Sequence, residues 1–212
     1  MWVPTVRPYR SPRREHDAAN TRSDILTAAR ELFTANGYAR VTVADIARQA
    51  RVATKTVYAS AGSKADILNE LIASAVADSG AHETLAAVQR TTDLQQALDT
   101  LAHGTRVGNE THQDAINIMY AAMSVHDDAQ ALWKQGTTLY RAVLRDIAAH
   151  LKDSGALPDN LDVDRGADIL WFCFGTSAWR TLTKDCRWTW DDAEHWLSRQ
   201  AVAMLGNKAA AR

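Results

Sequence analysis

Apolar residues recur every three or four positions along most of the chain, which is the spacing of one face of an α-helix. Ile25, Ala29 and Phe33 are an example near the N-terminus. The strict alternation of apolar and polar residues that marks a strand between hairpin turns is absent. Only one proline, Pro158, follows residue 12, and proline interrupts helices. We therefore expect an all-α fold.

A hydroxyl residue followed three positions later by aspartate is a weaker form of the capping box that begins a helix. This motif occurs at a regular interval, at Thr21/Asp24, Thr42/Asp45 and Ser63/Asp66. We expect further boxes at Thr92/Gln95 and Thr189/Asp192, and loops at Gly108–Glu110 and Gly155–Asn160. The helices that follow from these signals lie near residues 21–36, 43–50, 54–60, 64–79, 82–90, 93–107, 112–125, 128–154, 163–184 and 190–205.

The chain divides into three expected parts. Residues 1–20 carry three prolines and several arginines, so we expect a flexible basic arm. This arm either reaches a minor groove of DNA or, as we favour, has no role. Residues 21–79 are expected to form one helical domain, with a boundary at Ser79-Gly80, and residues 80–212 a second.

Residues 42–58, TVADIARQARVATKTVY, contain two short apolar-periodic runs separated by a break. Neither run is long enough to form a stable helix alone. Counted from Val43, the fifth residue is Ala47, the ninth is Arg51 and the fifteenth is Val57. A helix-turn-helix needs a small residue where its helices cross, a left-handed turn residue, and an apolar residue that buries its second helix. Ala47 and Val57 fit these needs, and residues 21–79 are expected to be a three-helix helix-turn-helix domain that binds DNA.

The outer face of the second short helix carries one cation, two hydroxyls and a phenol, which are groups that contact phosphates and base edges. Recognition helices place their N-terminal residues in the major groove. The alternative is a pair of packed helices with a solvated polar face. The candidate DNA-binding residues are Thr42, Arg51, Thr54, Lys55, Thr56, Tyr58 and Lys64, with Thr42, Tyr58 and Lys64 expected on backbone phosphates.

Charge divides in the same way as the motifs. Residues 1–70 hold 11 Lys and Arg against 7 Asp and Glu, whereas the rest of the chain is acidic. This asymmetry suggests an anionic partner for the N-terminal third only, although a surplus of this size also arises by chance. Two cysteines are too few for a disulfide framework, and no apolar run is long enough for a membrane span, so we expect a cytoplasmic protein.

Residues 25–68, ILTAARELFTANGYARVTVADIARQARVATKTVYASAGSKADIL, resemble the N-terminal domain of the tetracycline-repressor (TetR) family. The matching pieces are IL-x-AA-x-x-LF, the Gly37-Tyr38 stop, TV-x-DIA, V-x-x-x-T-V-Y and GSK before an acidic residue and a leucine. The resemblance implies a homodimer whose N-terminal domains bind the two half-sites of a palindromic operator in double-stranded DNA. It also implies a C-terminal helical domain that binds a small molecule and pairs the subunits.

Three positions depart from the family pattern. Arg51 replaces the usual turn glycine, either for a phosphate contact or, as we favour, as a tolerated strain. Ala53 replaces the usual serine, so the recognition helix loses its cap unless Thr54 caps it one residue later. Ser60-Ala61 replace a histidine-phenylalanine pair, which removes apolar packing.

Residues 168–205 resemble the closing helix pair of the family, which forms a four-helix bundle with the dimer mate. An apolar stripe on the last expected helix contains Ala193, Leu197, Ala201, Met204 and Leu205. The helix before it is apolar on more than one face, which predicts burial on several sides. We expect these two helices to form the dimer interface.

Six of the seven tryptophans lie between residues 133 and 196. Aromatic and methionine residues gathered in one helical domain suggest a cavity for an apolar or aromatic ligand, although such residues are more often plain core. The candidate ligand-binding residues are Met119, Tyr120, Met123, Trp133, Tyr140, Trp171, Phe172 and Phe174.

Enzyme signatures are missing from the sequence. No group of His, Cys, Asp or Glu has metal-ligand spacing, and neither a glycine-rich phosphate loop nor a G-x-S-x-G motif occurs. We therefore expect no catalytic residues, no metal and no cofactor. The leading hypothesis is a dimeric transcriptional regulator, a repressor released from its operator by a small apolar or aromatic ligand. The alternative is a DNA-binding protein without a small-molecule effector, which acts structurally or through a protein partner.

Overall fold

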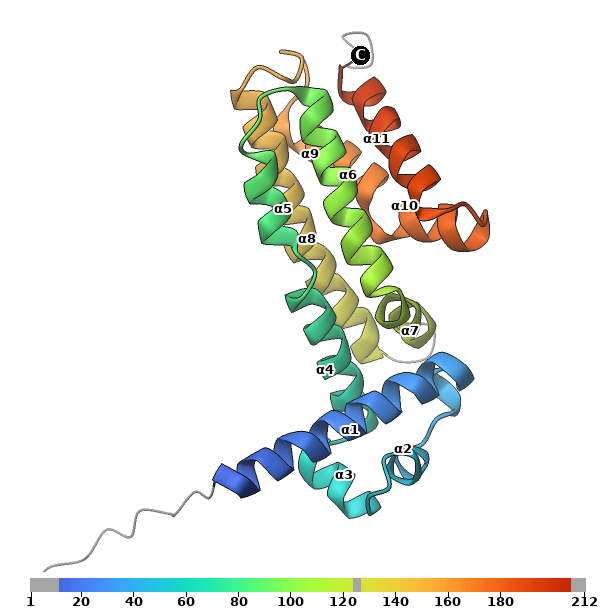
Figure 1. The fold of residues 1–212 in the computed structure, drawn as a ribbon. Helices are drawn as coiled ribbons and strands as arrows, with labels where there is room; N and C mark the ends of the chain where they lie inside the picture. Colours follow the sequence, from blue (N-terminus) through green and yellow to red (C-terminus); the bar gives the residue numbers. More distant parts are fainter. Residues whose placement is uncertain (1–11, 124–126, 207–212) are drawn as a thin grey trace, which may run out of the picture.

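The computed structural model describes residues 12–123 and 127–206, and all regular structure in these two ranges is helical (Figure 1). The all-α expectation is confirmed. The helices are α1 (Pro12–Asn36), α2 (Val43–Gln49), α3 (Thr54–Ala61), α4 (Lys64–Ala77), α5 (Ala81–Val88), α6 (Leu94–Thr111), α7 (Gln113–Met123), α8 (Asp127–Asp153), α9 (Val163–Phe174), α10 (Thr176–Arg180) and α11 (Trp190–Gly206), with a 3₁₀ turn at Tyr38–Arg40 and a π-helical segment at Thr181–Asp185.

The small lower unit of the molecule consists of α1 to α3 and the start of α4 (Figure 1). Its core is built from the apolar positions of these helices, including Ile25, Phe33, Ile46 and Val57, each at most 2% exposed. Helices as short as α2 and α3 are marginal alone, so α1 and α4 supply the apolar surface that stabilises them. The expected helix-turn-helix core is therefore confirmed.

Capping boxes begin two of these helices. The hydroxyl of Thr42 accepts from the Asp45 N–H at the start of α2, and that of Ser63 accepts from the Asp66 N–H at the start of α4. The third expected box is wrong, because Thr21 lies inside α1 and its hydroxyl donates to the Asp17 carbonyl four residues earlier. A hydroxyl residue inside a helix returns its hydrogen bond to the preceding turn instead of capping.

The first helix begins earlier than the sequence pattern indicates. α1 starts at Pro12, so residues 12–20, which we expected in a flexible arm, extend this helix. Proline suits the first turn of a helix because the N–H it lacks has no partner there. The remainder of the expected arm, residues 1–11, lies outside the described residues.

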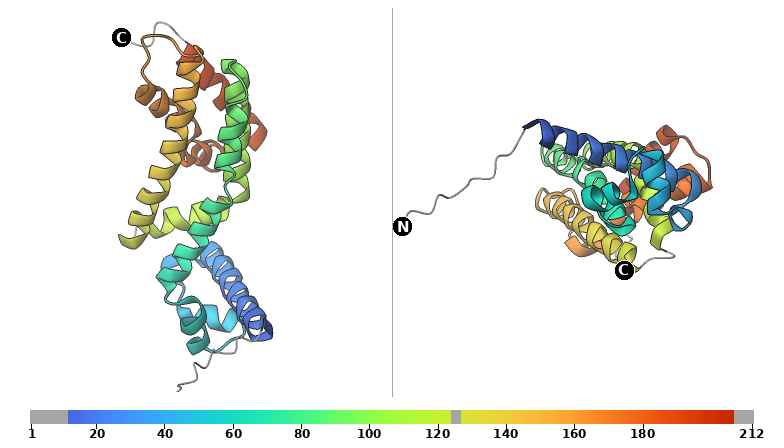
Figure 2. Two further views of the ribbon diagram at one scale, coloured as in Figure 1. Left: turned by 90° about the vertical axis from the view of Figure 1, so that its left-hand side faces the viewer. Right: turned by 90° about the horizontal axis from the view of Figure 1, so that it is seen from below.

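The larger upper unit is a helical bundle of α5, α6, α8, α9 and α11 around one apolar core (Figures 1 and 2). Leu98 and Leu101 of α6, Leu144 and Ile147 of α8 and Leu170 of α9 are buried in it. The long helices run roughly along the axis of the molecule, away from the lower unit. This core is separate from the one that stabilises the helix-turn-helix.

The expected loop at Gly108–Glu110 is wrong, because α6 continues through it to Thr111. Its two glycines permit close packing instead of a turn. A Cβ at Gly104 would lie 2.2 Å from the Thr84 hydroxyl of α5, and one at Gly108 would lie 3.0 Å from the Ser79 carbonyl oxygen. The cap of α6 is Asp93, which accepts from Gln96, and not the expected Thr92.

The single helix expected over residues 163–184 is also interrupted. α9 ends at Phe174, Gly175 is extended, and a short helix and the π-helical segment continue to Asp185. A Cβ at Gly175 would lie 2.6 Å from the Trp171 carbonyl oxygen, so glycine is required at this bend. The expected loop after α8 and the expected cap Thr189/Asp192 are both present.

Two helices join the units. α4 begins in the lower unit and extends toward the upper one, and α7 lies across the junction (Figures 1 and 2). Ile118, Met119 and Ala122 of α7 are buried in the same cluster as the core of the helix-turn-helix. The lower core therefore includes one face of α7.

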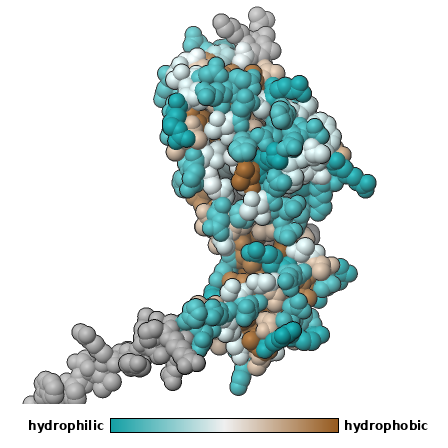
Figure 3. All heavy atoms as spheres, viewed as in Figure 1, coloured by the Kyte–Doolittle hydropathy of each residue, from teal (hydrophilic) through white to brown (hydrophobic). Residues whose placement is uncertain are grey.

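The face shown in Figure 3 is mainly hydrophilic, with hydrophobic residues scattered over it and at the narrow junction of the two units. None of the helices in the described segments is both long and apolar enough to span a membrane.

Candidate nucleic-acid interface and ligand cavity

The turn between α2 and α3 is built on two backbone hydrogen bonds. The Val52 N–H donates to the Ala47 carbonyl and the Arg51 N–H to the Arg48 carbonyl, which is the Schellman arrangement at a helix end. This arrangement requires a left-handed residue, and Arg51 has φ 56°. Its side chain is exposed and forms no ion pair within the described residues. The left-handed geometry predicted at this position is confirmed, although the residue is not glycine.

The N-terminus of α3 presents uncommitted polar groups to solvent. Ala53 precedes the helix and makes no side-chain cap, and Thr54 does not replace it. The side chains of Thr54, Lys55 and Tyr58 are exposed, and 56% of Tyr58 is accessible. Thr56 is half-buried, on the flank of this surface. In Figure 1, α3 lies at the far end of the molecule from the upper unit, where a duplex has room to approach.

The Thr42 hydroxyl is already committed to its capping box. Its N–H and its O–H both donate to the Asp45 carboxylate, at 3.0 and 2.6 Å. These bonds from Thr42, helped by Arg48, hold the pKa of Asp45 below its usual range. A phosphate contact by the Thr42 hydroxyl requires this pair to open.

The ammonium of Lys64, which we expected on a backbone phosphate, has its partners inside the protein. Its ammonium donates to the carbonyls of Tyr38 and Val41, at 3.0 and 2.9 Å, and lies 4.3 Å from the centre of the Tyr38 ring. Partial burial lowers the pKa of Lys64. Lys64 therefore ties the start of α4 to the turn after α1.

Sequence reasoning missed the ion pair that holds the recognition helix in place. Arg22 of α1 binds both carboxylate oxygens of Glu70 in α4, at 2.8 and 2.6 Å, and also donates to the Ser60 carbonyl at the end of α3. These partners are 48 and 38 residues away. No local pattern in the sequence indicates such a contact.

A cavity of about 570 Å³ lies within the upper unit, between α4, α5, α6, α7, α8 and the end of α9. Its wall is mostly apolar, with polar groups that include Thr105, Asn109 and His112. This is the volume of a site for a small organic molecule. The apolar and small residues that line it include Ile72, Leu101, Gly104, Ala115, Ile116, Leu132, Gly136, Leu139 and Val143.

Half of the predicted ligand-binding residues line this cavity: Met119, Trp133, Tyr140 and Trp171. The other four do not. Phe174 is buried in the core and Phe172 is 70% exposed on the outside of α9. Tyr120 lies behind Trp133, with ring centres 4.9 Å apart, and Met123 packs against the lower core. Aromatic character in the sequence did not distinguish residues that line the cavity from residues of the core. Small residues such as Gly136 also line the cavity, and nothing in the sequence indicates this.

Tyr140 is fixed in the wall by its hydroxyl, which donates to the Phe174 carbonyl at 2.8 Å where α9 bends. Desolvation in this partly buried position raises the pKa of Tyr140. The Trp171 ring lies 5.7 Å from the Tyr140 ring, edge to face. These contacts join the cavity wall to the bend at Gly175.

The expected stripe on α11 packs inside its own chain. Ala193, Leu197, Ala201 and Leu205 are buried in the upper core, and only Met204 of the stripe faces outward, 37% exposed. The stripe therefore belongs to the core of its own chain, and a dimer interface on the last two helices stays a prediction that rests on their outward faces. The outward apolar residues of α9 and α11 are Phe172, Trp196 and Met204.

Comparisons with known proteins agree with this geometry. The sequence model of "Bacterial regulatory proteins, tetR family" matches residues 25–71, which contain the helix-turn-helix. The probable HTH-type transcriptional regulator ArpR of Pseudomonas putida is 30% identical over 167 residues, which cover 73% of this chain and 77% of that protein.

Solved structures share the fold of the whole chain. The fatty acid degradation regulator FadR of Bacillus halodurans superposes with a TM-score of 0.71 at 16% identity, covering 92% of this chain and 96% of FadR. The SmeT–triclosan complex has a TM-score of 0.67 at 16% identity, over 90% and 94% of the two chains. The helix-turn-helix, the matched residues and the relative at 30% identity show that this chain belongs to the TetR family and is a DNA-binding transcriptional regulator.

Proposed function

We propose that the protein is a dimeric repressor that leaves a palindromic operator when a small, largely apolar molecule enters the cavity of the upper unit. The observation that carries this proposal is the double position of α7. Met119 lines the cavity and is also buried in the core of the helix-turn-helix unit. One side chain thus contacts both the ligand space and the packing that positions α3.

The proposed route from ligand to DNA runs through α7 and α4. Ile72 of α4 lines the same cavity and packs against the same lower core as Met119. A ligand that displaces these two helices shifts the reading helices of both subunits. In a dimer that fits two successive major grooves, the two reading helices lie about 34–36 Å apart. Ligand that forces another spacing lowers operator affinity.

The exposed apolar residues of α9 and α11 support the dimer. Phe172, Trp196 and Met204 are large and exposed, and Cys173 of α9 and Met204 of α11 have their sulfurs 3.9 Å apart, which places these helices side by side. Large apolar side chains exposed on two adjacent helices are candidates for an interaction surface. We propose that the mate covers it.

The alternative without an effector requires a filled upper core. The cavity of about 570 Å³ opposes that alternative, because its volume and mostly apolar wall suit a small organic molecule. In addition, the triclosan complex shows a small aromatic molecule bound by a protein of the same fold. We therefore favour the ligand-responsive repressor.

A gel shift with DNA from immediately upstream of the gene for this protein tests the proposal. We expect wild-type protein to shift this DNA and a panel of small aromatic compounds to contain at least one that releases it. Release must be saturable and must accompany a change in tryptophan emission from the upper unit. Operator binding that no compound weakens would favour the alternative without an effector.

A further inference from the structure

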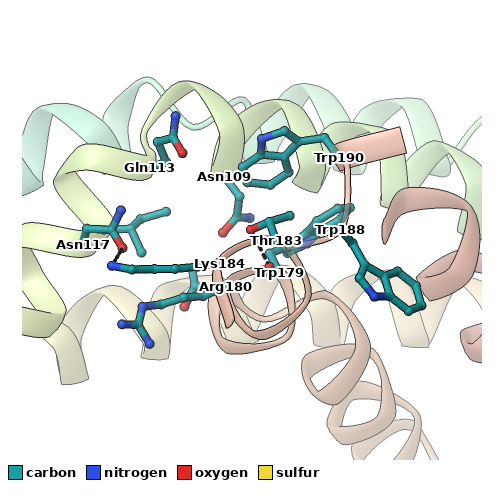
Figure 4. Close-up of a pocket in the computed structure, with 11 residues that line it drawn as sticks. Asn109, Gln113, Asn117, Trp179, Arg180, Thr183, Lys184, Trp188 and Trp190 are labelled. Carbon is teal, nitrogen blue, oxygen red and sulfur yellow. Dashed lines mark hydrogen bonds between the residues drawn. The ribbon is translucent and has the colours of Figure 1, made fainter. Parts of the chain in front are cut away.

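A second, polar hollow of about 300 Å³ lies beside the main cavity, between α6, α7, α10 and the π-helical segment (Figure 4). We refer to it as the polar pocket. Its wall combines amides, hydroxyls and indole rings with two cations, and consists of Asn109, Gln113, Ile116, Asn117, Thr176, Trp179, Arg180, Thr183, Lys184, Trp188 and Trp190.

The charges in the polar pocket are not balanced. Arg180 and Lys184 lie four residues apart on one helical segment and extend in the same direction in Figure 4. Asp and Glu are absent from the lining residues, and neither cation forms an ion pair within the described part of the chain. Like charges at this helical spacing repel each other. An anion between them would remove this repulsion.

The partners that the two cations do have are neutral. Lys184 donates to the side-chain oxygen of Asn117 at 3.1 Å, and the Arg180 guanidinium lies 4.8 Å from the centre of the Tyr120 ring. The Nε of Arg180 and the indole nitrogen of Trp179 are buried without a hydrogen-bond partner among the described residues. Buried donors without partners are costly, so this site is short of acceptors.

The polar pocket adjoins the main cavity. Asn109, Ile116 and Thr176 line both spaces. The carboxylates of the main cavity, Glu83 and Asp146, lie on α5 and α8 and do not line the polar pocket. A ligand that spans both spaces therefore meets apolar groups in the cavity and cations at the end beside α10.

We propose that the effector is an organic acid, with an aromatic or aliphatic body in the main cavity and a carboxylate held by Arg180 and Lys184 in the polar pocket. This inference rests on the proposed function and names its ligand class. Arg180 has several N–H donors and Lys184 three, which suits a carboxylate with two oxygens. Trp188 and Trp190 are part of the pocket wall and provide an optical signal for its occupation.

Matched acids and amides test this assignment on the full-length protein. The probes are 4-phenylbutyrate against 4-phenylbutyramide and octanoate against octanamide, with binding measured by calorimetry and by tryptophan emission. Each pair keeps the apolar body and removes only the charge. We expect each acid to bind at least about tenfold more tightly than its amide, because hydrogen bonds to charged groups are the stronger ones.

The variants Arg180→Gln and Lys184→Gln should each reduce the preference for the acid over the amide, and the double variant should abolish this preference. Arg180→Lys keeps the positive charge and should therefore retain more of the preference for the acid than Arg180→Gln does. The control is Arg145→Gln, which removes a cation that is paired with Asp164 on the outside of the bundle. This control should keep the full preference for the acid.

Three results would overturn the assignment: acids and amides of equal affinity, a preference that survives the double variant, or no binding of any acid at millimolar concentration. Failure of the proposed repressor mechanism looks different. In that case the acids bind with the expected preference, but operator affinity in the gel shift does not change. Release by neutral compounds alone would retain the repressor mechanism and reject the carboxylate site.

Discussion

The backbone conformation of Arg51 is strained for an L-residue that carries a side chain. Its φ of 56° places it in the left-handed region, where only glycine is free of the Cβ clash. The Schellman bonds around it hold the residue there, so the strain is local to the turn. Its exposed guanidinium contacts no carboxylate within the described residues.

Arg51→Gly should therefore stabilise the protein. We expect the free energy of unfolding to rise by about 0.5–1 kcal/mol. This is the cost of holding a non-glycine residue in the left-handed region, reduced by the greater conformational entropy that glycine has in the unfolded chain. Urea unfolding measures this gain. Operator affinity should be unchanged, in agreement with a tolerated strain. A clear loss of affinity would instead assign Arg51 a phosphate contact.

Lys55 and Tyr58 are the exposed groups of α3 best placed for DNA. Lys55→Ala should weaken operator binding markedly. It should also reduce the slope of log K against log salt concentration by about one per half-site, because a protein with one phosphate contact fewer releases fewer counterions on binding. Tyr58→Phe should weaken binding less. Fluorescence anisotropy on labelled operator measures both.

Lys134→Ala is the matched control for Lys55→Ala, because Lys134 is an exposed lysine on α8 in the upper unit. It should bind operator like wild type, and all three variants should keep the dimer in size-exclusion chromatography. Unchanged affinity in both α3 variants would mean that another surface reads the DNA.

At the level of single helices, α3 lacks the cap that α2 and α4 have. Ala53→Ser should supply an acceptor for the free N–H groups at its start, as Ser63 does for α4. We expect about 1 kcal/mol of added stability from such a cap. Thermal unfolding measures it. Ala59→Ser, at an exposed position inside the same helix, controls for the serine itself and should not stabilise.

Lys64 joins the start of α4 to the turn after α1 through its ammonium. Lys64→Met keeps the length of the side chain but leaves the Val41 carbonyl without its lysine partner, so we expect a loss of about 1 kcal/mol or more. The exposed Lys55→Met should change stability by less than about 0.5 kcal/mol. If the two variants unfold at the same denaturant concentration, the internal role of Lys64 is wrong.

Two cores form from the described residues of the molecule, and α7 connects the lower one to the main cavity. If ligand and operator compete through this connection, linkage requires that each weakens the other by the same factor. We expect a factor of about 5–150, which is typical of coupled sites.

Calorimetry with a compound that releases the operator tests this reciprocity. Its affinity for the operator-bound protein should be lower than for free protein by the factor measured in the gel shift. With Lys55→Ala, the same DNA should leave the ligand affinity unchanged because no complex forms. Equal ligand affinity in free and operator-bound wild-type protein would contradict the coupling.

The sequence by itself determined the helix-turn-helix, because its information is local. Ala47, Arg51 and Val57 stand at fixed offsets, and the boxes at Thr42 and Ser63 act within one helical turn. Periodicity likewise placed most helices of the upper unit. Interactions of this range are encoded in neighbouring residues, so a single chain suffices to predict them.

Only the tertiary structure decided which side chains face empty space. Phe174 and Trp171 are both aromatic and three residues apart, yet one is core and the other lines the cavity. Glycines predicted as a loop, such as Gly108, instead allow helices to approach closely. The pairing of Arg22 with Glu70 depends on residues that are distant in the chain, and so does the placement of Arg180 and Lys184 beside the amides of Asn109 and Asn117. Cavities and ion pairs arise from the packing of whole helices, and no local pattern records that packing.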